Sequence, residues 1–327
     1  MKVLYIGDVH AEVKTLGDCS RLIDFIEQQA ISYSPDMICF LGDLFHNHSV
    51  VHLSVLEFWH KSLNRLSKSA KDIVCLVGNH DRSVNSKESA HSMILFDNKQ
   101  YKIVEDYWTK NNVLFVGYKF NSEEFYYICN NIFDCKTVVC HQTFDGARYE
   151  NGFYAKDGWD LSKIPQKEVI SGHIHLKSTF SKVKYPGAPR SITLSDKNED
   201  KYIHIAEHAP SGAIISFEPI LVDVCSKIIE FNYNEENKEV PVFKNTDKVF
   251  VNLSGTAKFI EENREKLLTL GIKVKTQLEN RTLVQVKESD GITSSFVNFV
   301  TGFSSKNGTS NEVLAQMASG RIKWTMS

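Results

Sequence analysis

Short apolar runs alternate with helical patterns over the first 200 residues of the chain. The helical patterns cover residues 17–30 and 51–66, where apolar side chains recur at three- and four-residue spacings. The apolar runs, each of which predicts a strand, cover residues 3–6, 37–41, 73–77, 137–140 and 169–170. Strands that alternate with helices in this way predict an α/β layered domain.

From residue 202 the pattern becomes that of a hairpin. Apolar stretches at residues 202–206 and 213–217 lie on either side of the turn Pro210-Ser211-Gly212. The chain then becomes polar between residues 225 and 244, and we place a domain boundary in this stretch. Residues 1–225 are therefore predicted to form the main domain.

The remaining residues predict a small module and a tail. A strand at residues 249–253, a helix at 256–270 and strands at 272–277 and 282–286 predict a β-α-β-β module within residues 240–288. Residues 291–327 contain two short helical patterns on either side of a linker with glycine and serine, which predict a helix-loop-helix tail. The expected fold class is α/β, with a small C-terminal α+β module and a helical tail.

Composition narrows the class of protein. No stretch approaches the ~18 consecutive apolar residues of a membrane span, and the N-terminus lacks the pattern of a signal peptide. The seven cysteines include Cys39, Cys75 and Cys140 within predicted strands, which favours buried thiols in a reducing compartment. We therefore expect a cytoplasmic protein without membrane association. The net charge of −2 argues against nucleic-acid binding by bulk electrostatics, so a DNA substrate would require a local basic strip or a partner.

Candidate metal ligands gather in five short clusters, each at the end of an apolar run. The clusters are Gly7-Asp8-Val9-His10, Gly42-Asp43-Leu44-Phe45-His46, Gly78-Asn79-His80-Asp81, His141-Gln142 and Gly172-His173-Ile174-His175. Carboxylate, imidazole and amide oxygen form a ligand set for divalent Mn, Fe or Zn. Because the carboxyl ends of neighbouring strands meet at one crevice of an open α/β sheet, the clusters are expected to converge. One such cluster is a weak signal, whereas five in this order predict a two-metal phosphoesterase.

The residue types indicate a role for each ligand. The expected ligands are Asp8, His10, Asp43 and His175 for one ion, and Asp43, Asn79, His141 and His173 for the other. Asp43 is the natural bridging ligand, because one carboxylate has lone pairs for two metals. Two ions ~3.5–4 Å apart would activate a hydroxide and clamp the phosphate for in-line attack.

Two residues beside a ligand are candidate catalytic groups. His80 follows Asn79 directly and is expected to stabilise the transition state or to protonate the leaving oxygen. Asp81 is expected to orient the His80 imidazole and to raise its pKa. The histidines at positions 60, 91, 204 and 208 are expected to have no catalytic role, whereas the roles of those at 48 and 52 stay open.

These motifs resemble those of the calcineurin-like metallophosphoesterases, a superfamily with a two-sheet sandwich flanked by helices. Within it, the chain looks most like the SbcD nuclease subunits, whose family includes the meiotic-recombination-eleven DNA repair nucleases. The Gly-Asp-Leu-Phe-His sequence of residues 42–46 is the most discriminating match, and Tyr185-Pro186-Gly187 follows the last motif as in that family. The resemblance covers about residues 1–225.

The resemblance implies an activity and partners. It implies a Mn-dependent exonuclease on double-stranded DNA ends that is also an endonuclease on single strands or hairpins, in recombination and repair. Mn is the expected ion, with Mg, Fe and Zn as alternatives. The implied partners are DNA ends and an SMC-like ATPase of the SbcC type, with a homodimer of this subunit in a heterotetramer. His46 is implied as a further catalytic residue near the DNA end. The compact chain is similar to phage or bacterial members, which implies the cytoplasm of a bacterium or a phage-infected host.

Some features depart from the family or lie outside its motifs. Ala188 stands where the family usually has serine, so the hydroxyl that would contact phosphate is missing. Residues 240–288 are expected to be a cap that contacts DNA, and residues 291–327 either bind the ATPase or pack on that cap. Arg82, Lys177 and Arg190 lie near motifs and are candidates for phosphate contacts.

Two other functions are compatible with the same metal ligands. A metallophosphatase or a cyclic-nucleotide phosphodiesterase is the main alternative. The serine/threonine phosphatases resemble Gly-Asp-x-x-Asp-Arg-Gly at the second motif, where this chain has Phe45-His46-Asn47-His48, so that version is disfavoured. A non-enzymatic scaffold with a degenerate site is disfavoured because all seven expected ligands are present.

Overall fold

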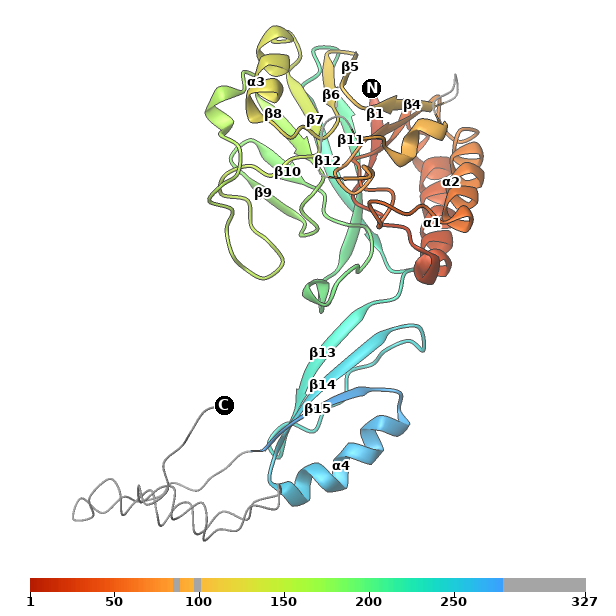
Figure 1. Ribbon diagram of the computed structural model, residues 1–327, viewed down its shortest axis with the longest axis vertical. Coiled ribbons are helices and arrows are strands. Elements are labelled where there is room, and N and C mark those ends of the chain that lie inside the picture. The colour runs from red at the N-terminus through yellow and green to blue at the C-terminus, as the bar shows by residue number, and fades with distance from the viewer. Residues whose placement is uncertain (85–88, 97–100, 279–327) are drawn as a thin grey trace, which may run out of the picture.

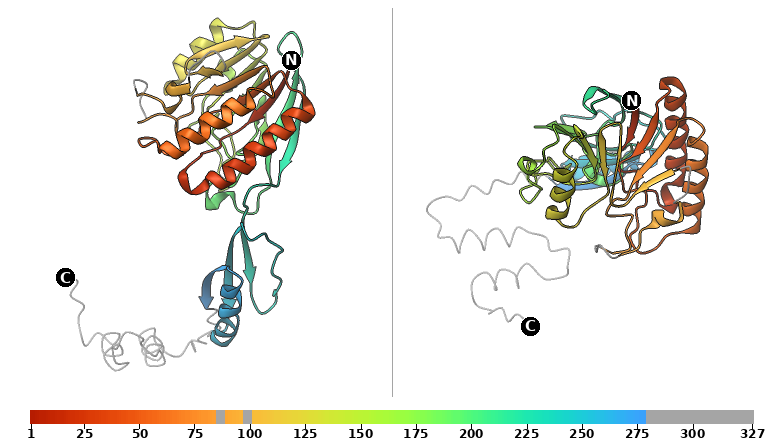
Figure 2. Two further views of the ribbon diagram at one scale, coloured as in Figure 1. Left: turned by 90° about the vertical axis from the view of Figure 1, so that its right-hand side faces the viewer. Right: turned by 90° about the horizontal axis from the view of Figure 1, so that it is seen from above.

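The structure is a computed structural model that describes residues 1–84, 89–96 and 101–278. Its larger unit contains two six-stranded sheets, and a three-stranded sheet forms a smaller unit that Figure 1 shows below the larger one. Figure 2 shows the helices on the outer side of the sheets. The predicted two-sheet α/β sandwich is therefore confirmed.

The first sheet is built around the N-terminal strand. Its spatial order is β12 (Ile214–Val222), β11 (Lys201–His208), β1 (Lys2–Ile6), β2 (Met37–Phe40), β3 (Asp72–Leu76) and β4 (Tyr101–Val104). Strands β1 to β4 pair in parallel, whereas β11 and β12 form the expected antiparallel hairpin. The carboxyl ends of β1, β2 and β3 therefore meet at one edge of the sheet.

The second sheet has the same arrangement of parallel strands at its centre. Its order is β5 (Tyr107–Lys110), β6 (Val113–Val116), β7 (Thr137–Cys140), β8 (Glu168–Ser171), β10 (Val183–Tyr185) and β9 (Ser178–Phe180). Strands β6, β7, β8 and β10 pair in parallel, and the edge strands β5 and β9 are antiparallel. The ends of β7 and β8 therefore lie at one edge as well.

Helices α1 (Leu16–Tyr33), α2 (Leu53–Leu66) and α3 (Ser122–Asn131) cover the outer faces of the two sheets. The smaller unit contains α4 (Ala257–Thr269). Short 3-10 helices are η1 (Val13–Thr15), η2 (Ser92–Phe96), η3 (Leu161–Lys163) and η4 (Leu194–Asp196). The two helices predicted from the apolar spacing correspond to α1 and α2. Helix α3 begins after Asn121, whose side chain accepts a hydrogen bond from the Glu123 N–H at 2.8 Å.

The central strands β1, β2, β3, β6 and β7 are mostly apolar because both of their faces are buried. In β1, Leu4 and Ile6 pack with α1 and α2, whereas Val3 and Tyr5 belong to the core between the two sheets. Successive strand residues point to opposite faces, so continuous apolar runs are expected for strands between two layers. The absence of alternation in the sequence therefore follows from the sandwich.

The described residues of the smaller unit form three strands, whereas the sequence predicts two strands in this part of the chain. Its sheet order is β13 (Ile228–Tyr233), β14 (Lys248–Gly255) and β15 (Lys273–Leu278), with parallel pairing throughout. Strand β13 lies in the stretch interpreted as a polar boundary; its apolar side chains Ile229 and Phe231 pack on the core under α4. The predicted strand at 282–286 and the tail at 291–327 lie outside the described residues.

All seven cysteines are free and buried, as expected for thiols in a reducing compartment. Within the part of the chain that the structure describes, no helix has the length and apolar character required to cross a membrane.

Candidate metal centre

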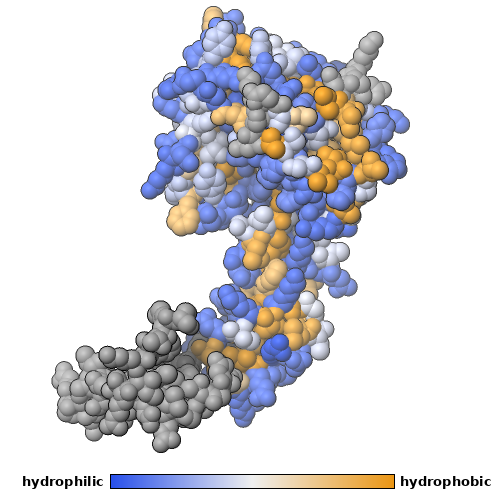
Figure 3. Space-filling model, viewed as in Figure 1, coloured by the Kyte–Doolittle hydropathy of each residue, from blue (hydrophilic) through white to orange (hydrophobic). Residues whose placement is uncertain are grey.

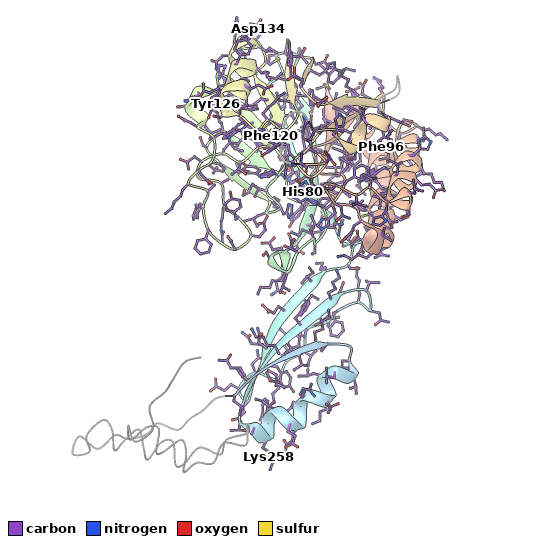
Figure 4. The ribbon with its side chains drawn as sticks, in the orientation of Figure 1. His80, Phe96, Phe120, Tyr126, Asp134 and Lys258 are labelled. Atoms are coloured by element: carbon purple, nitrogen blue, oxygen red, sulfur yellow. The ribbon has the colours of Figure 1, made fainter. Side chains whose placement is uncertain are left out.

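The five ligand clusters lie at the carboxyl ends of β1, β2, β3, β7 and β8, as the sequence predicts. The first three strands belong to one sheet and the last two to the other, so the ligands come from both layers. Figure 4 shows His80, from one of these clusters, in the middle of the larger unit. The tertiary structure therefore brings residues more than 160 positions apart into direct contact.

The first group of donors contains Asp8, His10 and His175, whose ligand atoms lie within 4.8 Å of one another. The Nε2 atoms of His10 and His175 are 3.2 Å apart. Asp8 Oδ1 accepts a hydrogen bond from the His173 backbone N–H at 2.8 Å. Asp8 Oδ2 is buried and has no hydrogen-bond partner among the described residues. A buried carboxylate oxygen without a hydrogen-bond donor calls for a water or a cation beside it.

The second group contains Asp43, His141 and His173, with Asn79 beside them. Asn79 Oδ1 lies 3.1 Å from His141 Nε2 and 2.8 Å from His173 Nδ1. The His141 Nδ1–H donates to the carbonyl oxygen of Leu41 at 2.7 Å, so Nε2 is the nitrogen that faces the centre.

Asp43 joins the two groups. Its Oδ2 is 3.5 Å from His10 Nε2 in the first group and 3.3 Å from His141 Nε2 in the second. Its Oδ1 accepts a hydrogen bond from the His80 backbone N–H at 2.8 Å. Asp43 is therefore placed where it could contribute to both groups through Oδ2, while Oδ1 holds the third motif in place.

The spacing of the donor atoms fits two divalent ions. Adjacent ligands that each lie about 2.1 Å from one ion are roughly 3 Å from each other, and the pairs His10–His175, Asn79–His141 and Asn79–His173 have distances of 3.2, 3.1 and 2.8 Å. Two imidazole nitrogens that face each other at this distance repel unless a proton or a cation lies between them. The mixture of carboxylate, amide and imidazole donors suits Mn, Fe or Zn.

The pKa values of the candidate ligands depend on burial and on the two neighbouring carboxylates, Asp8 and Asp43. Although burial alone lowers the pKa of His141, the carboxylates of Asp43 and Asp8 raise it to about 9. Burial and the neighbouring His141 lower the pKa of His173 to about 3. Burial alone would raise the pKa of Asp43, but His141 and His10 bring it below its ordinary value. The centre therefore favours a positive charge between the two carboxylates.

Three ligands have a left-handed backbone that L-residues rarely adopt. The φ angles of His10, Asp43 and His173 are 48°, 51° and 78°. Such conformations cost about 1–3 kcal/mol each, persist where surrounding structure holds them, and cluster at functional sites. The turn at each strand end thus directs the side chain to the centre at some cost in stability.

The glycine of the third motif provides space for the bridging carboxylate. A Cβ atom on Gly78 would lie 2.2 Å from Asp43 Oδ1. We expect Gly78→Ala to destabilise the protein by about 1–3 kcal/mol, as overpacking does, and to weaken Mn binding. Gly17→Ala is the matched control, because its Cβ would meet only an Arg21 side-chain atom at 3.9 Å and α1 would gain about 1 kcal/mol. Thermal unfolding with and without Mn measures both effects, and equal behaviour of the two variants would contradict the packing argument.

His80 lies beside both groups. Its Nδ1–H donates to the carbonyl oxygen of His46 at 2.9 Å, so Nε2 is the atom available for substrate. Its ring centroid is 4.6 Å from that of His10 and 4.1 Å from that of His48. A ligand atom of His80 also lies within 4.8 Å of His10 and Asp43. His80 is therefore placed to donate a proton or a hydrogen bond at the centre.

Asp81 has a different role from the predicted one. Its carboxylate accepts hydrogen bonds from the backbone N–H groups of Phe45, at 3.0 Å, and Gly78, at 2.9 Å. Burial, with the charge of Asp43 nearby, raises the pKa of Asp81 to about 7. The partner that orients the His80 ring is instead the His46 carbonyl. Asp81 thus connects the loops of the second and third motifs, and its role as a partner of the His80 imidazole is corrected.

His46 contributes through its backbone and lies close to the centre. Its ring centroid is 5.4 Å from that of His10 and 6.0 Å from that of His80. Burial lowers the pKa of its imidazole, and its Nδ1 has no hydrogen-bond partner among the described residues. His46 thus lies near the two donor groups but outside them, and its role as a catalytic residue stays a prediction.

Two of the three basic candidates for phosphate contact are buried. The Arg82 guanidinium pairs with Glu105 and donates to the Ser89 carbonyl. The Arg190 guanidinium donates to the carbonyl oxygens of Val9 and His10, so it supports the loop after β1. Both arginines are 3% exposed, which corrects their prediction as substrate contacts. Lys177 is exposed, with its Nζ 3.6 Å from the ring centroid of Tyr202, and stays a prediction.

Two residues near the centre were not predicted from the sequence. Glu150 Oε1 accepts the His175 backbone N–H at 2.7 Å, and the Tyr118 ring centroid is 5.9 Å from that of His173. Tyr118 follows β6, and a polar or aromatic residue just after a strand is a signal that the same strand-end argument supports. Glu150 lies in a long loop without a local pattern, so no sequence signal indicated it.

Comparisons with known proteins identify the family of the chain. The sequence model for calcineurin-like phosphoesterases matches residues 1–237. The chain is similar to the DNA double-strand break repair protein Mre11 of Nanoarchaeum equitans (strain Kin4-M), at 23% identity over 242 residues, and to Exonuclease subunit 1 of Enterobacteria phage T4, at 27% over 222 residues. The alignments cover 63% and 62% of this chain and 65% and 63% of the two relatives, so the chain spans just under two thirds of each relative's length. The family resemblance stated from the motifs is confirmed: the chain belongs to the calcineurin-like phosphoesterase family.

Proposed function

We propose that the chain is a two-metal phosphodiesterase that acts as the nuclease subunit of a complex for processing DNA double-strand ends. It would be an exonuclease on duplex ends and an endonuclease on single strands or hairpins, in recombination and repair. The observation that carries the proposal is the convergence of two donor groups on Asp43 Oδ2. The similarity to Mre11 and to Exonuclease subunit 1 supports DNA as the substrate.

The residues of the centre divide the chemistry between them. When bound, two divalent ions supply an activated water and offset charge on the phosphoryl oxygens. One ion would be held by Asp8, His10 and His175. The other ion would be held by Asn79, His141 and His173, and Asp43 would bind both ions. His80, oriented by the His46 carbonyl, would present Nε2–H to the phosphoryl or leaving oxygen. Mn is the proposed ion because the resemblance to the SbcD nucleases implies it, and the mixed oxygen and nitrogen donors are compatible with it.

We also propose a homodimer and an SMC-like ATPase partner of the SbcC type. An apolar surface on α2 and η2 supports the dimer, since Leu53, Ile94 and Leu95 are 82%, 60% and 70% exposed. Figure 3 shows this area as a hydrophobic surface on the right of the larger unit. A pocket lies between the two elements, lined by Leu56 and Phe96 among others. Exposed apolar surfaces of this kind are typical of protein interfaces.

The proposed roles of the C-terminal segments follow the sequence. The cap module (240–288) would contact DNA, and the tail (291–327) would bind the ATPase. These boundaries are proposals, with β13 added to the module because it pairs with β14. The proposed location is the cytoplasm of a bacterium or a phage-infected host, which the seven free, buried thiols support.

The proposed nuclease activity has a direct test. Purified protein with Mn is expected to degrade an end-labelled linear duplex, alone or with a co-purified ATPase, and to lose this activity when a chelator removes the metal. The same preparation is assayed on a generic phosphomonoester and on a cyclic nucleotide. Strong turnover of either small substrate without action on DNA would refute the nuclease and favour the phosphatase or cyclic-nucleotide phosphodiesterase.

A further inference from the structure

His48 lies two residues beyond the second motif, and the sequence leaves its role open. Its side chain is exposed, yet its ring lies against that of His80. The two ring centroids are 4.1 Å apart, and the angle between the ring planes is 30°. The contact therefore joins a residue without an assigned role to the candidate proton donor of the centre.

The loop that carries His48 is held in place on both sides of this residue. The His46 backbone N–H donates to the Ala11 carbonyl at 3.2 Å, and the Ser49 hydroxyl donates to the Ser83 carbonyl at 2.8 Å. Because the backbone is fixed at two nearby points, the His48 ring keeps its contact at a smaller entropy cost than a ring on a free loop. The position of the ring beside the third motif thus follows from the packing of two motif loops.

One hydrogen bond by itself does not fix the plane of the His80 ring. The His80 Nδ1–H donates to the His46 carbonyl at 2.9 Å, which fixes one atom and allows the ring to tilt about this bond. His10 meets the ring in a T-shaped contact, with centroids 4.6 Å apart at 86°. His48 lies closer and more nearly parallel, so it opposes the tilt that would turn Nε2 away from the metal centre.

The position of His48 does not suit a metal ligand. Among the described residues, one group of candidate ligand atoms contains His80 with His10 and Asp43, and none of the groups contains His48. The ring contact with His80 is the link between His48 and the centre. A role for His48 in the reaction would therefore act through His80.

We propose that His48 is a positioning residue, whose ring holds the His80 imidazole in the orientation that presents Nε2 to the metal centre. The proposal rests on the proposed phosphodiesterase function, in which His80 donates a proton or a hydrogen bond at the centre. One aromatic contact favours a single orientation by about 2- to 10-fold. Loss of the contact would lower the turnover of a step that needs His80 by this factor and leave substrate binding unchanged.

Kinetics on an end-labelled duplex with Mn tests the effect on turnover. We expect His48→Ala to lower kcat about 2- to 10-fold, with KM within about twofold of the wild-type value and two ions bound. His48→Phe keeps a ring without ring nitrogens and is expected to retain the wild-type kcat. In a His80→Asn background, His48→Ala is expected to have no further effect, because the contact acts only through His80.

His52→Ala is the matched control for the kinetics. His52 is an exposed histidine in the same connection between β2 and α2, and its side chain makes no capping hydrogen bond. We expect this variant to retain the wild-type kcat in both backgrounds.

A second measurement does not depend on turnover. NMR of the full-length protein, loaded with diamagnetic Zn and labelled with carbon-13 at histidine Cε1, reports the surroundings of each ring. The His80 signal is the one that is absent from His80→Asn. His48→Ala is expected to move this signal because it removes the neighbouring ring, whereas His52→Ala leaves it in place.

An unchanged kcat or an unmoved His80 signal in His48→Ala would overturn the positioning role. Loss of an ion, equal losses in His48→Ala and His48→Phe, or a further loss in the His80→Asn background would overturn it as well, since each shows that His48 acts by other means. A wild-type protein that degrades no duplex would refute the nuclease, and the NMR signal would then decide whether His48 holds the His80 ring.

Discussion

Replacing Asp43 with asparagine is expected to lower Mn-dependent phosphodiester hydrolysis by at least about 1000-fold and to reduce the bound metal from two ions to at most one. The loss of a single electrostatic group at an active site costs up to about 1000-fold, and Asp43 would serve both ions. Its Oδ2 lies 3.3 Å from His141 Nε2 and 3.5 Å from His10 Nε2. An amide has one oxygen and no charge, so it would not bridge two cations while also accepting the His80 N–H.

Metal stoichiometry by elemental analysis and hydrolysis of a chromogenic phosphodiester measure these two effects. Asp134→Asn is the matched control, because this exposed carboxylate lies at the top of the larger unit, away from His80 (Figure 4). Two bound ions and a normal rate in Asp43→Asn would show that the ions do not share this carboxylate.

Replacing His80 with asparagine is expected to lower kcat for DNA by about 100- to 10,000-fold while two metal ions stay bound, since a positioned acid contributes that much. The reason is that His80 presents Nε2 to the centre while the His46 carbonyl holds Nδ1–H. If His80 protonates the leaving oxygen, a substrate with a 4-nitrophenolate leaving group should lose much less activity than DNA, because this leaving group departs without a proton.

The His80 variant also tests whether this residue is a ligand. Its ligand atom lies within 4.8 Å of His10 and Asp43, so a role in metal binding has a specific geometric basis. Loss of one ion in His80→Asn would assign His80 to the metal. Equal losses for DNA and for the 4-nitrophenyl ester would assign it to phosphate stabilisation instead of proton transfer. His60→Asn, an exposed histidine on α2, is the matched control.

Local patterns in the sequence were sufficient to predict an α/β layered domain and a set of candidate ligands, and the resemblance of the motifs added the two-sheet sandwich. An apolar run of four or five residues predicts a buried strand, and a polar ligand just after it lies at the strand's carboxyl end. This argument places Asp8, Asp43 and His141 without knowledge of long-range contacts. Strand β13 was missed because its flanking Asn, Glu and Lys residues dominate the local composition, whereas its burial depends on α4, more than 20 residues further along the chain.

Partners of side chains were decided only by the tertiary structure. Nothing near Asp81 in sequence shows that it accepts the Phe45 and Gly78 N–H groups, and nothing near Arg190 shows that it donates to the loop after β1. Hydrogen-bond partners depend on distance in space, and charge alone does not distinguish a buried, paired arginine from one that faces a phosphate. The hydrogen bond from the His175 backbone N–H to Glu150 could not be predicted from the sequence for the same reason.

The sequence by itself predicted a set of candidate metal ligands, because ligand type and strand-end position are local properties of the chain. The tertiary structure decided which of these side chains lie next to each other and which atoms are their hydrogen-bond partners. It brought Asp43 Oδ2 within 3.5 Å of His10 Nε2 and 3.3 Å of His141 Nε2, and it gave the His80 ring its partner in the His46 carbonyl. These outcomes depend on how the two sheets pack, since each joins residues from strands that are distant in sequence.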